Sequence, residues 1–219
     1  MLWTRNGPPT KTLAGREGRR LVLGGHPVLM VGTDPVGVEE QLLEGVLACP
    51  DCAGSLRPWG HARWRTRREE SVSVRHRPRR AACSSCGRTH VLLPASGLVR
   101  RADAVAVIGA ALLAKAAGAG HRRIATALGR PASTVRGWLR RFTTQAERVR
   151  VLFTGLLHAL DPQAPPLPTT GSSFADAVEV VGRAAAAAAR RLGPVRPWQF
   201  AATASAGRLL ALPSRVRGT

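Results

Sequence analysis

The sequence contains no tyrosine, and all aromatic residues together make up only 4% of its 219 residues. A core built from this chain must therefore come from Leu, Val and Ala side chains rather than from large rings. The same shortage leaves few aromatic platforms for stacking unpaired bases, which disfavours a protein specialised for single-stranded nucleic acid.

Acidic residues are also scarce: 13 Asp and Glu stand against 33 Lys and Arg, which gives a net charge of +20. Lysine is almost absent, with only Lys11 and Lys115, so arginine carries the charge. A GC-rich genome favours arginine over lysine but does not explain the missing acids. A surface this positive attracts polyanions, above all nucleic acid. A membrane surface fits less well, because no basic amphipathic helix with bulky apolar residues stands out.

Long apolar runs are missing too. No stretch reaches the roughly 18 apolar residues that a transmembrane helix needs, so we expect no membrane partner. Arg5 and Lys11 near the N-terminus are not followed by an apolar segment, so we expect no signal peptide. These absences favour a cytoplasmic, nucleoid-associated protein, whose thiols stay reduced.

Only four cysteines occur, and they form two pairs, Cys49-x2-Cys52 and Cys83-x2-Cys86. Two such pairs can aim four thiolates at one ion, which is the tetrahedral ligand set of structural zinc. The interval between the pairs leaves room for a β-hairpin, as in zinc ribbons. A redox or disulfide role is a weaker alternative, because redox motifs use one pair in a βαβ context. Iron or an iron–sulfur cluster is weaker still. We expect a closed, non-catalytic Zn²⁺ site.

Residues close to the cysteines support this prediction. Gly54 and Gly87 follow the two pairs, where glycine allows the positive φ that turns the chain beneath a metal. His61, His76 and His90 could compete as ligands, but four thiolates already complete a tetrahedron. We therefore expect these histidines to be bystanders.

The segment between the two cysteine pairs is loaded with arginine. Residues 57–80 contain nine Arg, against only Glu69 and Glu70. One short hairpin with so much unbalanced charge favours phosphate contact over a merely solvated surface. We expect Trp59 to pack on the cysteine unit. The candidate phosphate-binding residues are Arg63, Arg65 and Arg67.

Residues 121–142, HRRIATALGRPASTVRGWLRRF, have the pattern of a helix-turn-helix motif. Ile124 and Leu128 share one face of a first helix. Gly129 suits a tight turn that needs a positive φ, and Pro131 suits the start of a second helix. The other expected core positions are Ala125, Val135, Trp138, Leu139 and Phe142.

The outer face of this motif predicts contact with DNA. Residues 121–141 contain six Arg and no acid, which argues against an ordinary helical hairpin with a mixed charged face. The second helix, 132–142, would enter the major groove. Ser133 and Arg136 are the best candidates for base contact, because Arg pairs with guanine N7 and O6. The remaining candidates are Arg122, Arg123, Thr134, Gly137, Arg140 and Arg141.

These patterns predict a mainly α fold with a small β zinc ribbon, in which a helix-turn-helix bundle is followed by C-terminal helices. For the C-terminal helices we expect an N-cap at Ser172 or Ser173 and either packing within the chain or a role in dimerisation. Met30 offers an alternative translation start. The expected segments are a disordered extension at 1–26, an αβ lead-in with the four-cysteine zinc ribbon at 27–94, a helix-turn-helix domain at 95–160, a Pro-rich linker at 161–173 and a helical pair at 174–213.

The order of the motifs, CPDC…CSSCGRTHVLLP followed by IATALGRPASTVRGWLRRF, resembles the N-terminal part of bacterial insertion-sequence transposases. It is more closely similar to a family of short bacterial proteins with a zinc ribbon and a helix-turn-helix, over about residues 27–213. The resemblance implies that Cys49, Cys52, Cys83 and Cys86 bind zinc and that helix 132–142 reads DNA.

The chain departs from transposases at the catalytic centre, where those enzymes use carboxylates to hold two divalent metals. After residue 147 the only acids are Asp161, Asp176 and Glu179. We therefore expect no enzyme activity. The hypothesis is a sequence-specific binder of double-stranded DNA, acting as a mobile-element-associated regulator or as a targeting subunit with a transposase or a second copy as partner. The alternative is an RNA-binding or non-specific architectural protein.

Overall fold

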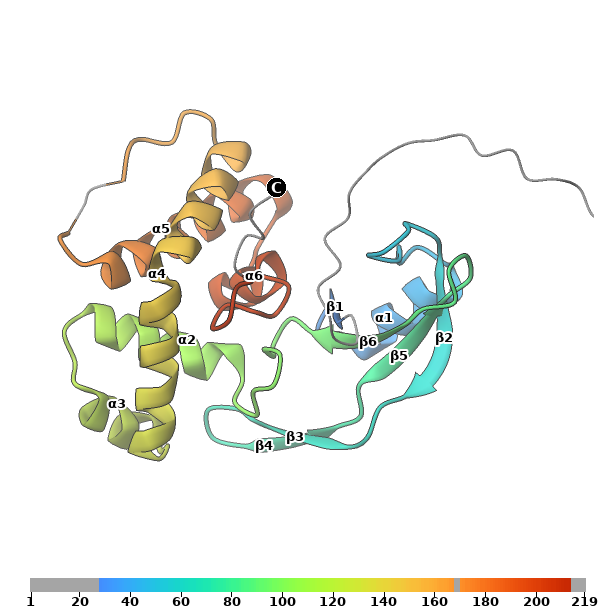
Figure 1. Ribbon diagram of the computed structural model, residues 1–219, viewed down its shortest axis with the longest axis horizontal. Coiled ribbons are helices and arrows are strands. Elements are labelled where there is room, and N and C mark those ends of the chain that lie inside the picture. Colours follow the sequence, from blue (N-terminus) through green and yellow to red (C-terminus); the bar gives the residue numbers. More distant parts are fainter. Residues whose placement is uncertain (1–27, 168–169, 214–219) are drawn as a thin grey trace, which may run out of the picture.

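The computed structural model describes residues 28–167 and 170–213. The expected disordered extension, 1–26, lies outside the described residues. A small β unit and a larger helical unit stand side by side and contact each other (Figure 1). The fold is mainly α with a small sheet, as the sequence predicts. Within the described part of the chain, no helix is long and apolar enough to cross a membrane.

A four-stranded sheet forms the β unit, in the order β1-β6-β5-β2. Its strands are β1 (Val28–Val31), β2 (Leu56–His61), β5 (Arg79–Cys83) and β6 (Thr89–Pro94). β1 runs parallel to β6, and the other pairs are antiparallel. Helix α1 (Pro35–Leu43) is capped by the carboxylate of Asp34, which accepts from the N–H groups of Val36 and Gly37.

The core of this unit is small. Its largest buried side chains are Leu42, Leu56 and Leu92. The smaller residues that complete it are Val31, Val38, Ala81, Cys49 and Cys83. So few buried residues contribute little stabilisation by themselves, and units of this size usually need a metal or another cross-link.

A second hairpin extends from the sheet towards the helices. β3 (Arg65–Arg68) pairs antiparallel with β4 (Ser73–His76), and the register places Arg65 opposite His76. We call residues 62–78 the hairpin arm. The arm leaves the sheet between β2 and β5, and its far end lies beside the helical unit (Figure 1).

The helical unit begins with three helices, α2 (Val105–Ala116), α3 (His121–Leu128) and α4 (Ala132–Leu160). The helix that the sequence predicts at 132–142 is the first part of one continuous 29-residue helix. The cause is a buried stripe that continues beyond Phe142. Its later members are Ala146, Val149, Phe153 and Leu157.

Two C-terminal helices pack on this rod rather than standing apart. α5 (Ser173–Leu192) lies along α4, where the rings of Phe142 and Phe174 meet edge to face at 4.8 Å between centroids. Ser172 is the N-cap, since its hydroxyl accepts from the N–H of Ala175. α6 (Pro197–Ala204) places Trp198 directly over Gly109 of α2, where a Cβ would lie 2.2 Å from the ring.

Candidate functional site

The four cysteines lie together at one end of the sheet. Cys49 and Cys86 are 3.8 Å apart between sulfurs, and Cys52 and Cys83 are 3.4 Å apart. All four sulfurs lie within 4.8 Å of one another, and none is joined in a disulfide. Four thiolates around zinc at about 2.3 Å would have sulfurs about 3.8 Å apart. The cluster therefore fits a tetrahedral metal ion.

The backbone of each cysteine pair turns sharply around its first sulfur. The N–H of Asp51 donates to Cys49 Sγ at 3.4 Å, and the N–H of Ser85 donates to Cys83 Sγ at 3.4 Å. Gly87 has the positive φ that the sequence predicts. In the first pair, however, Ala53 takes the left-handed conformation, with φ 61°.

Gly54 therefore serves a purpose different from the expected one. Its φ is not positive, but a Cβ at this position would lie 2.3 Å from Ser85 Oγ and 3.1 Å from Cys83 Sγ. Only a residue without a side chain allows the two cysteine-bearing turns to approach this closely. The glycine thus fixes the distance between the two halves of the cluster.

Hydrogen bonds shift the pKa values of the Cys83 and Cys52 thiols in opposite directions. The backbone N–H of Cys86 stabilises the thiolate of Cys83 and, with that of Ser85, lowers its pKa to about 6. The backbone N–H of Gly54 favours the thiolate of Cys52, but hydrogen bonding to Cys83 and Cys86 outweighs it and raises the pKa of Cys52 to about 12. Thiols this close share protons, and a bound cation would replace them.

His90, which the sequence predicts is not a metal ligand, contacts one of the candidate ligands. The side chain is fully buried, and its Nε2 lies 3.4 Å from Cys49 Sγ. With Cys49 and Asp51 it forms a second group close enough to hold an ion. With a proton on Nε2, the imidazole would donate to the Cys49 thiolate and hold this candidate metal ligand in its orientation. The pattern of Cys spacing carries no signal for this contact, which joins residues 41 positions apart.

The helix-turn-helix has the geometry that its sequence predicts. Gly129 ends α3 in the left-handed region, with φ 59°, and its N–H donates to the carbonyls of Ala125 and Thr126. Pro131 is the N-cap of α4. Six of the expected core positions are buried, namely Ile124, Ala125, Val135, Trp138, Leu139 and Phe142, and Leu128 is partly buried against the same core.

The face opposite this core is open. The exposed or partly exposed candidate residues on α3 and α4 are Arg122, Arg123, Ser133, Thr134, Arg136, Gly137, Arg140 and Arg141. No carboxylate pairs with any of these arginines among the described residues. Arg141 donates only to the carbonyl of Gly137, at 3.2 Å. This face therefore carries unpaired arginines together with the small hydroxyl groups of Ser133 and Thr134.

The hairpin arm presents a second set of basic residues. Arg63 and Arg65 are exposed, whereas Arg67 is largely buried and donates to Glu69 at 2.7 Å, so its charge is neutralised within the arm. The expectation that Trp59 packs on the cysteine unit is wrong, because 59% of it is exposed. Trp64 is also exposed, at 57%, and the guanidinium of Arg75 lies 5.2 Å from its ring centroid.

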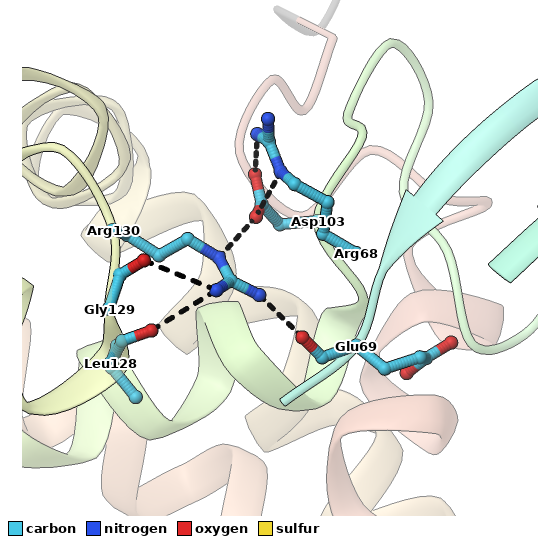
Figure 2. A network of polar contacts seen from close by, with 6 residues as sticks. All are labelled: Arg68, Glu69, Asp103, Leu128, Gly129 and Arg130. Carbon is cyan, nitrogen blue, oxygen red and sulfur yellow. Dashed lines mark hydrogen bonds and ion pairs between the residues drawn. The ribbon is translucent and has the colours of Figure 1, made fainter. Parts of the chain in front are cut away.

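A buried carboxylate ties the arm to the helix-turn-helix (Figure 2). Asp103, 3% exposed, accepts two hydrogen bonds from Arg68 of β3, at 3.0 and 2.6 Å, and one from Arg130 at 2.8 Å. Arg130 also donates to the carbonyls of Leu128 and Glu69. Burial raises the pKa of Asp103, but the hydrogen bonds from Arg68 and Arg130 outweigh that effect and lower it overall.

One segment of the chain matches a known protein family. Residues 102–150 match the family model of the homeodomain-like domain. No curated protein and no solved structure matches the chain. The matched segment contains α2, α3 and the first two thirds of α4, which are the helices of the helix-turn-helix. Residues 102–150 therefore form a homeodomain-like helix-turn-helix, an element that indicates binding to nucleic acid.

Proposed function

We propose that this protein reads the sequence of double-stranded DNA with the first part of α4. The observation that carries the proposal is the acid-free face of the homeodomain-like segment, where Ser133 and Arg136 are exposed near the start of the helix. A helix in the major groove presents its N-terminal residues to base edges. Arg136 would pair with guanine, while Arg140 and Arg122 would contact phosphates.

The cysteine cluster supports this role by holding zinc. The site would be closed, with Cys49, Cys52, Cys83 and Cys86 as its four ligands, so the metal would stabilise the fold and leave no position for a reacting water. The buried core of the β unit is too small to make the arm rigid without it. Arg63 and Arg65 on the arm would then contact the phosphate backbone beside the groove.

We infer that the chain binds DNA without cutting it. Two of the three late acids are engaged elsewhere, because Asp161 pairs with Arg190 at 2.8 Å and Asp176 accepts from Thr170. The third, Glu179, is exposed on α5. A regulator or a targeting subunit for a mobile element fits such a protein, acting on the nucleoid in the cytoplasm. A transposase or a second copy of the chain is the proposed partner.

One observation favours a second candidate function. Trp59 and Trp64 are exposed on an arginine-rich surface, which the low aromatic content did not lead us to expect. Indole rings flanked by guanidinium groups can stack on unpaired bases. Binding of RNA or single-stranded DNA by Trp64 of the arm and Trp59 of the adjoining strand β2 is therefore the alternative.

Selection from random DNA duplexes, with zinc-loaded protein at near-physiological salt, tests the proposal. We expect a consensus that is relaxed at one or two base pairs by Arg136→Ala and changed little by the control Arg196→Ala on an exposed residue before α6. A symmetric consensus would indicate a dimer, because half-sites mirror protein symmetry.

Competition between duplex DNA and single-stranded RNA distinguishes the proposed function from the alternative. If the wild type shows no consensus, and Trp64→Ala weakens binding to single-stranded RNA more than binding to duplex DNA, the arm is the binding site and sequence reading by α4 is wrong. If Trp64→Ala is neutral on both ligands, the alternative is wrong.

A further inference from the structure

The hairpin arm is held at both of its ends. At the sheet end it is an insertion between β2 and β5, whose opposite ends adjoin the cysteine cluster, because Leu56 at the start of β2 pairs with Cys83 at the end of β5. At the far end, the guanidinium of Arg68 binds the carboxylate of Asp103, just before α2 (Figure 2). The arm therefore connects the cysteine cluster to the helix-turn-helix.

The contact at the far end is specific. Arg68 donates to the two carboxylate oxygens at 3.0 and 2.6 Å, which makes the ion pair bidentate. Arg130, which follows the turn glycine of the helix-turn-helix, donates to the same carboxylate at 2.8 Å and to the carbonyl of Glu69 in the arm. The backbone of Arg68 also donates to Ala102 at 2.7 Å and accepts from Ala104 at 2.9 Å. These bonds together fix one docked position of the arm.

The sheet end of the arm depends on the metal. The β unit and the helical unit have separate cores, so the helices can stay folded when the sheet does not. Without the sheet, β3 and β4 are an isolated two-stranded hairpin, which is at best marginally stable in water. The arm thus has two states: it is docked when a metal cross-links the cysteines and loose when the metal is absent. The metal and the Arg68 side chain both favour the docked state.

We propose that zinc binding at the cysteine cluster and DNA binding by α4 are coupled through the contact between Arg68 and Asp103, so that each ligand strengthens the binding of the other. This inference rests on the proposed function and assigns Arg68 to it as a positioning residue. A docked arm holds Arg63 and Arg65 at a fixed distance from α4, so both elements can bind one duplex without a further loss of conformational freedom. A loose arm must be ordered at that moment, and its arginines then add less affinity.

The test measures the affinity for one duplex with and without zinc, in the wild type and in Arg68→Gln. We expect zinc to strengthen DNA binding about tenfold in the wild type but about threefold or less in Arg68→Gln. This variant leaves the carboxylate of Asp103 paired with Arg130, so the helical unit should stay folded. Arg196→Gln removes the same charge from an exposed site outside the arm and should keep the wild-type effect of zinc.

Arg68→Lys separates the geometry of the contact from its charge. Lysine keeps the positive charge but lacks the planar fork that binds both carboxylate oxygens. We expect zinc to strengthen DNA binding in this variant by a factor between those of the wild type and Arg68→Gln. The wild-type factor in Arg68→Lys would show that charge alone suffices, and it would overturn the role of the bidentate contact.

The reciprocal measurement is a second readout that does not depend on DNA affinity. Competition with a chelator measures the affinity for zinc with and without a saturating duplex. The duplex should raise the affinity for zinc by the same factor by which zinc raises the affinity for DNA, and this factor should shrink equally in Arg68→Gln. The absence of any increase in the wild type, or an undiminished increase in Arg68→Gln, would overturn the proposal.

Failure of this inference is distinguishable from failure of the proposed function. If selection recovers a consensus but zinc does not change the affinity of the wild type for that duplex, the coupling is wrong and sequence reading stands. If no consensus appears, the same measurements are made on an arbitrary duplex. Coupling that is lost in Arg68→Gln would then support the inference although sequence reading is wrong, and equal coupling in both proteins would overturn it.

Discussion

Arg130 follows the turn glycine of the helix-turn-helix, and its Nε donates to the carboxylate of Asp103 at 2.8 Å. Because Arg68 of the hairpin arm binds the same carboxylate, one buried acid fixes the arm to the turn of the helix-turn-helix. The β unit with the cysteine cluster and the helix-turn-helix thus meet through a specific polar contact, in a chain that has few acids.

Replacing Asp103 with Asn should destabilise the protein markedly. The change leaves Arg130, which is 12% exposed, without its counter-charge, and we expect a loss of about 3 kcal/mol in the free energy of unfolding. Urea denaturation measures it. Asp161→Asn is the matched control, because its partner Arg190 is 62% exposed and the pair should contribute less than about 1 kcal/mol. Equal losses from both variants would contradict the importance of the buried contact.

The same carboxylate predicts a pH dependence. The pKa of Asp103 is lower in the folded chain than in the unfolded chain, so its contribution to stability is complete above the unfolded value of about 3.9 and is lost as pH falls through the folded value. The stability difference between wild type and Asp103→Asn should therefore be constant between about pH 5 and about pH 7 and should shrink below about pH 4. A difference that persists unchanged in acid would show that the ionised carboxylate is not the cause.

Removal of zinc should unfold the β unit, including α1, and spare helices α2 to α6. The helical core is separate from the one that contains Cys49 and Cys83, so chelation should abolish the sheet while most of the helical circular dichroism remains. Metal analysis should find one zinc per chain in the wild type and none in Cys83→Ser, with Ser84→Ala as the control. Protein that is free of metal yet keeps the fold of its β unit would refute the zinc site.

Gly54→Ala should weaken the metal site without touching a ligand. Its Cβ would meet Ser85 Oγ at 2.3 Å, so the two cysteine turns would have to separate. We expect weaker zinc retention in competition with a chelator, and restoration when Ser85→Gly is added. Gly32→Ala, where a Cβ has open space, serves as the control. If Gly54→Ala retains zinc like the wild type, the close approach is not needed.

Local signals in the sequence predict much of the candidate site. The Cys-x-x-Cys spacing predicts the sulfur cluster, and Gly129 with the stripe from Val135 to Phe142 predicts the helix-turn-helix, because these patterns depend on near neighbours. The contacts that were missed join distant residues. Arg68 and Asp103 are 35 positions apart, and Cys49 and His90 are 41 apart, so no periodicity connects them.

The exposure of Trp59 was missed for a related reason. A tryptophan in a short strand predicts burial only if another layer covers that face, and here no layer covers it. α4 continues beyond the motif because α5 covers its later apolar stripe. The sequence shows that this stripe is helical but not which element covers it.

Because α4 is long, the segment that matches the family model is shorter than the segment that folds as one core. The homeodomain-like match ends at residue 150, in the middle of a helix that reaches Leu160 and buries Phe153 and Leu157 against the C-terminal helices. A fragment cut at the end of the match would leave that stripe bare and the last turns without support. The helix that carries Arg136 near one end is packed against α5 near the other, so a displacement of α5 would tilt the exposed first turns of α4.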